Sequence, residues 1–223
     1  MRILKIFGIL VLSFGAVFCS DAAFARTINV GVVIDGRTPN SSTLLEMIDE
    51  ETRKLLPEGD QINFVEKNIH DGNWNNSAIR QKFATLLEAP DADAILAVGP
   101  VASQIAAANE NLKKPVLAAH VINAAMQGLK KIDGTSGTPN LTYIDAGIDI
   151  GRHIDRFQEI RSFSRMHLLI SSYMLDGIAG LPEYLRKQAE ERGVKLVVIP
   201  VGSNLAEAVA KLADAEAVYV APM

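Results

Sequence analysis

Cysteine is almost absent from the sequence. Of 223 residues only Cys19 is a cysteine, and it lies inside an apolar N-terminal segment. A mature chain without that segment has no thiol. Disulfide bonds and thiol chemistry are therefore excluded.

Motifs for cofactors, metals and nucleophilic catalysis are also missing. No G-x-G-x-x-G follows the first strand, and the sequence has no Walker A loop and no G-x-S-x-G elbow. The four histidines have no metal-ligand spacing between them. We expect no cofactor, no metal site and no catalytic residues, and hence a protein that is not an enzyme.

The charge balance lacks an excess of basic residues. The chain has 22 Lys and Arg against 26 Asp and Glu, and removal of Arg2, Lys5 and Asp21 with the N-terminal segment leaves 20 against 25. A mildly acidic chain without a basic patch is not expected to bind nucleic acid.

The N-terminal segment has the three parts of a secretory signal peptide. Arg2 and Lys5 are basic, residues 6–18 are apolar, and Ala23 and Ala25 supply the small residues of a cleavage site. Thirteen apolar residues are few for a membrane span. The sequence predicts a signal peptide at 1–25, cleavage after Ala25, a periplasmic location and no membrane insertion of the mature chain. A lipoprotein signal at Cys19 is disfavoured by Phe18.

Strands and helices alternate along residues 27–145. Continuous apolar, β-branched runs such as 27–35 are typical of strands that are covered on both faces. The pattern predicts strands at 27–35, 62–69, 93–98, 116–120 and 140–145, with helices at 44–56, 77–88 and 103–112. Such alternation indicates an α/β fold with a doubly wound parallel sheet.

The alternation restarts after residue 145 and predicts a second lobe. Helices are expected at 148–162, 182–192 and 205–212, with strands at 167–171, 195–200 and 217–221. The predicted domains are an N-terminal lobe at 26–145 and a C-terminal lobe at 146–223. The second lobe has 78 residues against 119 from 27 to 145, so we expect it to be partial, as in a fragment.

Ligands of open α/β sheets lie beyond the carboxyl ends of the strands. This rule selects the loops that begin at Asp35, Gly99, His120 and Ser171. The backbone N–H groups after Gly99 are expected to hold a carboxylate or another anion, and Ser103 either adds a hydroxyl or only caps the helix. Asp35 is expected to meet an amine on a ligand or to cap a loop. Trp74 is a candidate lid residue or a surface plug.

The order of these segments resembles a known family. A secretory signal, INVGVVID, AILAVGPVASQIAAA, KKPVLAAHVINA and a restart after NLTYID are similar to the periplasmic substrate-binding proteins of ABC transporters. More narrowly, the sequence resembles the type I binding proteins of the tryptophan/tyrosine-binding-like group. Two positions depart from that pattern: Pro100 replaces a small hydroxyl residue, and Ile122–Asn123 replaces an Asp-Pro pair.

The resemblance implies two Rossmann-like or flavodoxin-like lobes that close on a small molecule, for example an amino acid, and a membrane permease as partner. Ligand contacts are then expected from Asp35, Gly99, Ser103 and His120 on one lobe, and from Ser171, Ser172 and Tyr173 on the other. Two other functions remain open at this point. One is a ligand sensor or envelope partner with the same fold, and the other is an enzyme that uses Asp35 or His120 as a base.

Overall fold

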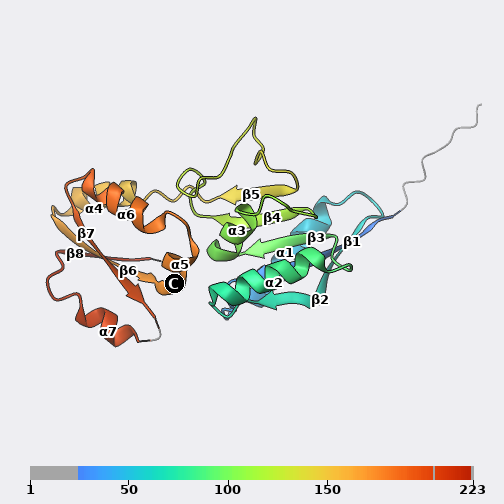
Figure 1. Cartoon of the computed structure of the whole chain (residues 1–223), viewed down its shortest axis with the longest axis horizontal. Helices are drawn as coiled ribbons and strands as arrows, with labels where there is room; N and C mark the ends of the chain where they lie inside the picture. The colour runs from blue at the N-terminus through green and yellow to red at the C-terminus, as the bar shows by residue number, and fades with distance from the viewer. Residues whose placement is uncertain (1–24, 203, 222–223) are drawn as a thin grey trace, which may run out of the picture.

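The computed structural model describes residues 25–202 and 204–221 as two α/β lobes (Figure 1). Each lobe has its own parallel sheet, and helices cover both faces of each sheet. The predicted signal peptide lies outside the described residues except for Ala25. No helix within the described ranges has the length and apolar character needed to cross a membrane.

The first lobe contains a five-stranded parallel sheet in the order β2-β1-β3-β4-β5. Its strands are β1 (Thr27–Ile34), β2 (Gln61–Asp71), β3 (Ala94–Val98), β4 (Val116–Val121) and β5 (Leu141–Asp145). Its helices are α1 (Ser41–Leu55), α2 (Asn76–Glu88) and α3 (Pro100–Ala107). The strand order reverses between β1 and β3, which in doubly wound sheets is where ligands bind.

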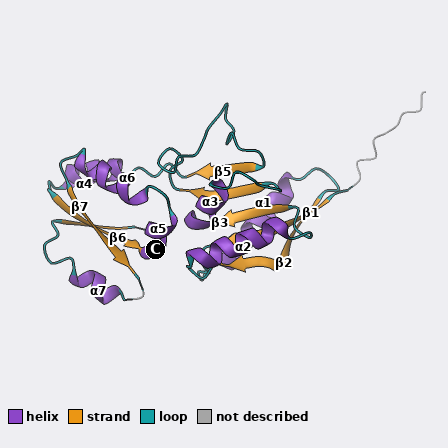
Figure 2. Ribbon diagram, in the orientation of Figure 1, coloured by secondary structure: helices purple, strands orange, loops and turns teal. Residues whose placement is uncertain are grey.

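Helices cover β1 and β3 on both faces, which explains their continuous apolar runs. Val33 and Ile95 face α2 and α3 together with the fully buried Ile79, whereas Val30 and Val32 face α1. Figure 2 shows α2 and α3 on the near side of the sheet and α1 behind it.

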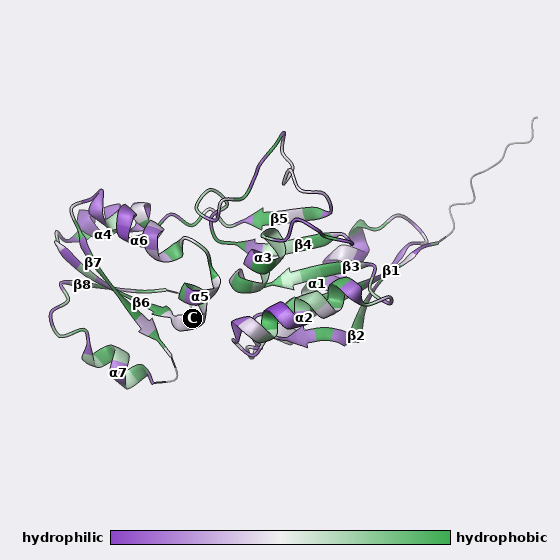
Figure 3. Cartoon of the chain, in the orientation of Figure 1, coloured by the Kyte–Doolittle hydropathy of each residue, from purple (hydrophilic) through white to green (hydrophobic). Residues whose placement is uncertain are grey.

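The second lobe has a three-stranded parallel sheet in the order β7-β6-β8 in the part that the structure describes. Its strands are β6 (Arg165–Ser171), β7 (Lys195–Val201) and β8 (Ala217–Val220). Its helices are α4 (Ile150–Ile160), α5 (Ser172–Gly177), α6 (Leu181–Glu190) and α7 (Leu205–Ala210). The outer faces of α4 and α6 are hydrophilic, as expected for helices with one face against a sheet (Figure 3).

Helix α5 joins the second lobe to the first. The Asn76 side-chain amide at the start of α2 donates a hydrogen bond of 3.0 Å to the carbonyl oxygen of Tyr173. Gly177 lies so close to Val101 that an added Cβ would come within 2.7 Å of its side chain. One buried apolar cluster, which includes Val101 and Met174, runs through both lobes. The lobes are therefore in direct contact.

Two predictions differ from the structure by more than small shifts of element ends. Helix α3 spans Pro100–Ala107 and not 103–112. It begins early because proline suits the first helical position, where no N–H partner is needed. The loop expected to follow Ser171 is instead the short helix α5. Six residues are too few to show helical periodicity, which is why the sequence did not reveal this helix.

Candidate functional site

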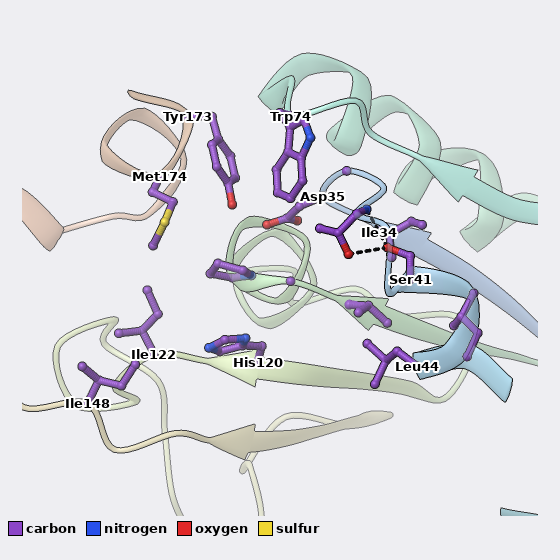
Figure 4. Close-up of a pocket in the computed structure, with 16 residues that line it drawn as sticks. Ile34, Asp35, Ser41, Leu44, Trp74, His120, Ile122, Ile148, Tyr173 and Met174 are labelled. Atoms are coloured by element: carbon purple, nitrogen blue, oxygen red, sulfur yellow. Dashed lines mark hydrogen bonds between the residues drawn. The ribbon is translucent and has the colours of Figure 1, made fainter. Parts of the chain in front are cut away.

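A cavity of about 280 Å³ lies where β1 and β3 end, between the two lobes. This is the point at which the strand order of the first sheet reverses. Residues of both lobes line it: Ile34, Asp35, Gly36, Thr38, Ser41, Leu44, Leu45, Trp74, Val98, Gly99, Pro100, His120, Ile122, Ile148, Tyr173 and Met174. Most of these side chains are apolar, as is usual for small-molecule sites. Figure 4 shows them converging from several elements.

Asp35, the residue after β1, places a buried carboxylate in this cavity. It is only 2% exposed. Its Oδ2 accepts a hydrogen bond of 2.9 Å from the backbone N–H of Val101, and its Oδ1 accepts one of 2.6 Å from that of Ala102. Asp35 thus caps the N-terminus of a helix that lies more than sixty residues further along the chain, where a negative charge is favourable.

The anion site predicted at the start of α3 is occupied by the protein itself. Pro100 has no N–H, the next two N–H groups bind Asp35, and the N–H of Ser103 donates to the carbonyl of Gly99 at 3.0 Å. In the part of the chain described here, no donor of that first turn remains for a ligand carboxylate. The groups that were expected to hold a ligand anion are therefore engaged within the protein in this structure.

Burial changes the acidity of Asp35. Loss of solvent raises the pKa of its carboxyl from 3.8 to about 6, although the two backbone hydrogen bonds act in the opposite direction. Burial, together with the nearby Asp35 charge, also raises the pKa of Tyr173. At neutral pH the Tyr173 hydroxyl is a neutral group beside a carboxylate that is mostly ionised.

Two aromatic side chains, one from each lobe, stand over Asp35 (Figure 4). Trp74 follows β2, Tyr173 is in α5, and their ring centroids are 5.2 Å apart in an edge-to-face arrangement. Trp74 has a positive φ of 57°, and its ring covers Gly36 so closely that an added Cβ would lie 2.2 Å from it. The backbone N–H of Trp74 also donates to the carbonyl of Asp35 at 2.7 Å.

Ser103 does not reach the cavity, contrary to the expectation that it contacts a ligand. Its side chain has no exposed surface. Its hydroxyl donates to the carbonyl of Ala97 at 3.2 Å and accepts from the backbone N–H of His120 at 2.9 Å. Ser103 therefore ties α3 to the ends of β3 and β4 and positions His120, which does line the cavity.

The change Ser103→Ala is expected to destabilise the fold by about 1–3 kcal/mol, because it leaves the His120 N–H and the Ala97 carbonyl without this partner. Chemical denaturation measures the change, and Ser42→Ala on exposed α1 is the control, expected within about 0.5 kcal/mol of the parent. Equal stability of both variants would show that the buried bridge contributes nothing.

The remaining predicted residues separate into two groups. Asp35, Gly99, His120 and Tyr173 line the cavity, whereas Ser171 and Ser172 do not. Ser171 is the N-cap of α5. Helix α5 instead presents Tyr173 and Met174 to the cavity (Figure 4).

Sequence reasoning missed the apolar wall of the cavity. Ile122 and Ile148 lie in loops after β4 and β5, and Leu44 and Leu45 lie near the start of α1. The only signal for them was their position after strands or at a helix start. Within residues 25–202 and 204–221, no cluster of three or more His, Cys, Asp and Glu suits a metal ion.

No family model matches the sequence, and no curated protein sequence matches it either. Solved structures do match its fold. The ABC domain in complex with L-Trp from Streptococcus pneumonia has a TM-score of 0.63 at 17% identity, covering 88% of this chain and 65% of its own. A conserved domain protein from Vibrio cholerae has a TM-score of 0.64 at 16% identity. The match covers 87% of this chain and 65% of that one.

A branched chain amino acid ABC transporter from Thermus thermophilus with bound valine has a TM-score of 0.60 at 17% identity. The match covers 88% of this chain and 53% of that one. The chain therefore has the type I periplasmic binding fold, and it spans between about half and two thirds of the length of these structures.

Proposed function

We propose that this chain is the solute-binding component of an ABC-type transporter and holds a small molecule in the cavity between its lobes. The observation that carries the proposal is the position of the cavity. It lies at the carboxyl ends of β1 and β3, where the strand order reverses, and α5 of the second lobe closes its other side. That position is the usual ligand site of an open α/β sheet.

The side chains that line the cavity also support the binding of a small molecule. Trp74 and Tyr173 come from different lobes and meet edge-to-face over a buried carboxylate. Trp74 keeps 39% of its surface exposed, so its ring is available to a ligand. A ligand that touches both rings would favour the arrangement in which the lobes are in contact.

Location and partners follow from this proposal. The predicted signal peptide directs the chain to the periplasm, and a membrane permease would receive the solute. The solved structures of the same fold include an ABC domain with L-Trp and an ABC transporter with valine. Because of these similarities, amino acids are included among the candidate ligands to be screened.

Thermal unfolding of the mature chain against amino acids, amines, sugars and purines tests the proposal. A ligand at a hundred times its Kd is expected to stabilise the chain by about 2.7 kcal/mol, which is a rise in Tm of roughly 5–10 °C for a protein of this size. Calorimetric titration of each hit then gives its Kd.

Two variants locate the binding site. Tyr173→Ala removes the ring from α5 and is expected to weaken binding at least tenfold. Phe157→Ala removes an equally large, partly exposed ring from α4, away from the cavity, and is expected to leave the Kd unchanged. If no compound in the panel binds, or if both variants bind as the parent does, the solute-binding proposal fails.

A further inference from the structure

The cavity contains a negative charge and no positive one. Among its described lining residues, Asp35 is the only acid, and neither Lys nor Arg is present. The nearby Arg37 points away, since its guanidinium pairs with Asp71 at 3.7 Å and 61% of its side chain is exposed. Burial lowers the pKa of His120 below 6.5, so its imidazole is neutral at pH 7.

A helix N-terminus is another common partner of a ligand carboxylate, and at the start of α3, beside Asp35, that position is already taken. The N–H groups of Val101 and Ala102 both donate to Asp35. An approaching carboxylate would meet the Asp35 charge at the same place, in surroundings where water screens it poorly. Beside Asp35 the cavity therefore disfavours an anionic ligand twice, by repulsion and because the N–H groups of α3 are engaged.

Asp35 retains acceptor capacity toward the cavity. A carboxylate has about four lone-pair sites, and the two backbone hydrogen bonds use one on each oxygen. A buried carboxylate without a cationic partner is unfavourable, so a ligand ammonium would relieve the cost of its burial. The rings of Trp74 and Tyr173, which stand over it in Figure 4, favour a cation as well.

The rest of the cavity suits a hydrocarbon body. Ile122, Ile148, Leu44 and Met174 form its walls. A volume of about 280 Å³ is nearly twice that of the ~150 Å³ engineered cavity that accommodates benzene. An aromatic ring with a two-carbon arm fits this space.

We propose that the ligand of this cavity is a small apolar amine, meaning an aromatic or hydrocarbon body with one ammonium group and no carboxylate. The proposal rests on the solute-binding function and specifies its ligand class. The ammonium binds Asp35, the body lies between the two aromatic rings and the aliphatic wall, and a free amino acid is rejected through its carboxylate.

Calorimetric titration with matched pairs tests this ligand class. Phenethylamine and L-phenylalanine differ only by the carboxylate, as do tryptamine and L-tryptophan. Each amine is expected to bind at least tenfold more tightly than its amino acid. 2-Phenylethanol, which has no charge, is expected to bind more weakly than phenethylamine.

Two further measurements identify Asp35 as the partner. Asp35→Asn is expected to weaken phenethylamine binding at least tenfold, whereas Asp176→Asn, which removes an exposed carboxylate from α5, leaves the Kd unchanged. In the unmodified protein, amine affinity is expected to fall about tenfold per pH unit below pH 6, because protonation neutralises Asp35. This second measurement does not require the variant to fold.

The outcomes separate the ligand class from the function. If an amino acid binds as tightly as its amine and Tyr173→Ala abolishes that binding, the chain is a solute-binding protein and the amine proposal is wrong. If amine binding is independent of both pH and Asp35, the proposal is also overturned. If neither the matched pairs nor the broader panel binds, both proposals fail.

Discussion

Gly99→Ala is expected to destabilise the protein by about 4 kcal/mol, which is a large part of the about 5–15 kcal/mol that stabilises a typical folded chain. Gly99 precedes α3 with φ 106° and ψ 158°, a backbone region that is essentially restricted to glycine. A methyl group here would also lie 2.5 Å from Cγ of Asp35. Backbone strain and the clash with the helix cap therefore add together, each costing roughly 1–3 kcal/mol.

Gly134→Ala separates these two causes. Gly134 also has a positive φ, of 81°, but an added Cβ there meets nothing within 4 Å. The expected loss is about 1 kcal/mol, which is the cost of the backbone conformation alone. Urea denaturation of both variants gives the comparison. A loss at Gly99 no larger than that at Gly134 would show that the contact with Asp35 does not constrain this turn.

The second large effect concerns the pH dependence of stability. The pKa of Asp35 is about 6 in the folded protein, against 3.8 as the unperturbed value. Between these two values the folded chain binds more protons than the unfolded chain, so the contribution of this group to stability falls as pH rises. It is fully present below about pH 4 and is lost as pH passes through 6. The total change is about 3 kcal/mol.

Asp35→Asn isolates this contribution, because other carboxyl groups titrate equally in parent and variant. The stability of the parent minus that of the variant is expected to decrease by about 2.5 kcal/mol between pH 4 and pH 7.5. The substituted amide retains an oxygen for only one of the two α3 N–H groups, so a constant offset is added at every pH. Denaturation at a series of pH values measures the difference. A difference that is flat or rises with pH would contradict the burial effect.

The sequence was sufficient to predict the parallel sheet and the edge where the cavity lies. The apolar runs that form β1 and β3 are nearly continuous. Such runs are typical of strands that are buried on both faces, and strands of that kind occur mainly in parallel sheets. The carboxyl ends of such strands share one edge, so Asp35, Gly99 and His120 were expected to lie together there, and all three line the cavity.

The roles of the side chains within the site could not be predicted in the same way. The Asp35 cap of α3 joins residues that lie far apart in the chain, and no local pattern encodes such a pairing. The same applies to Trp74 over Gly36 and to Ser103 between β3 and β4. The sequence could suggest a hydroxyl and free N–H groups near a ligand, but only packing decides which groups the fold itself uses.

The contact between α5 and the first lobe also affects the rates of ligand exchange. Asn76 holds the Tyr173 backbone, and Gly177 lies against Val101, so the cavity is already enclosed on both sides. Because the lobes are already in contact, the affinity for a ligand is not reduced by the cost of first reaching a rarely populated closed state. Separation of α5 from α2 and α3 would widen the path into and out of the cavity. We therefore expect Asn76→Ala, which removes one contact of α5, to accelerate association and dissociation in stopped-flow measurements of Trp74 fluorescence.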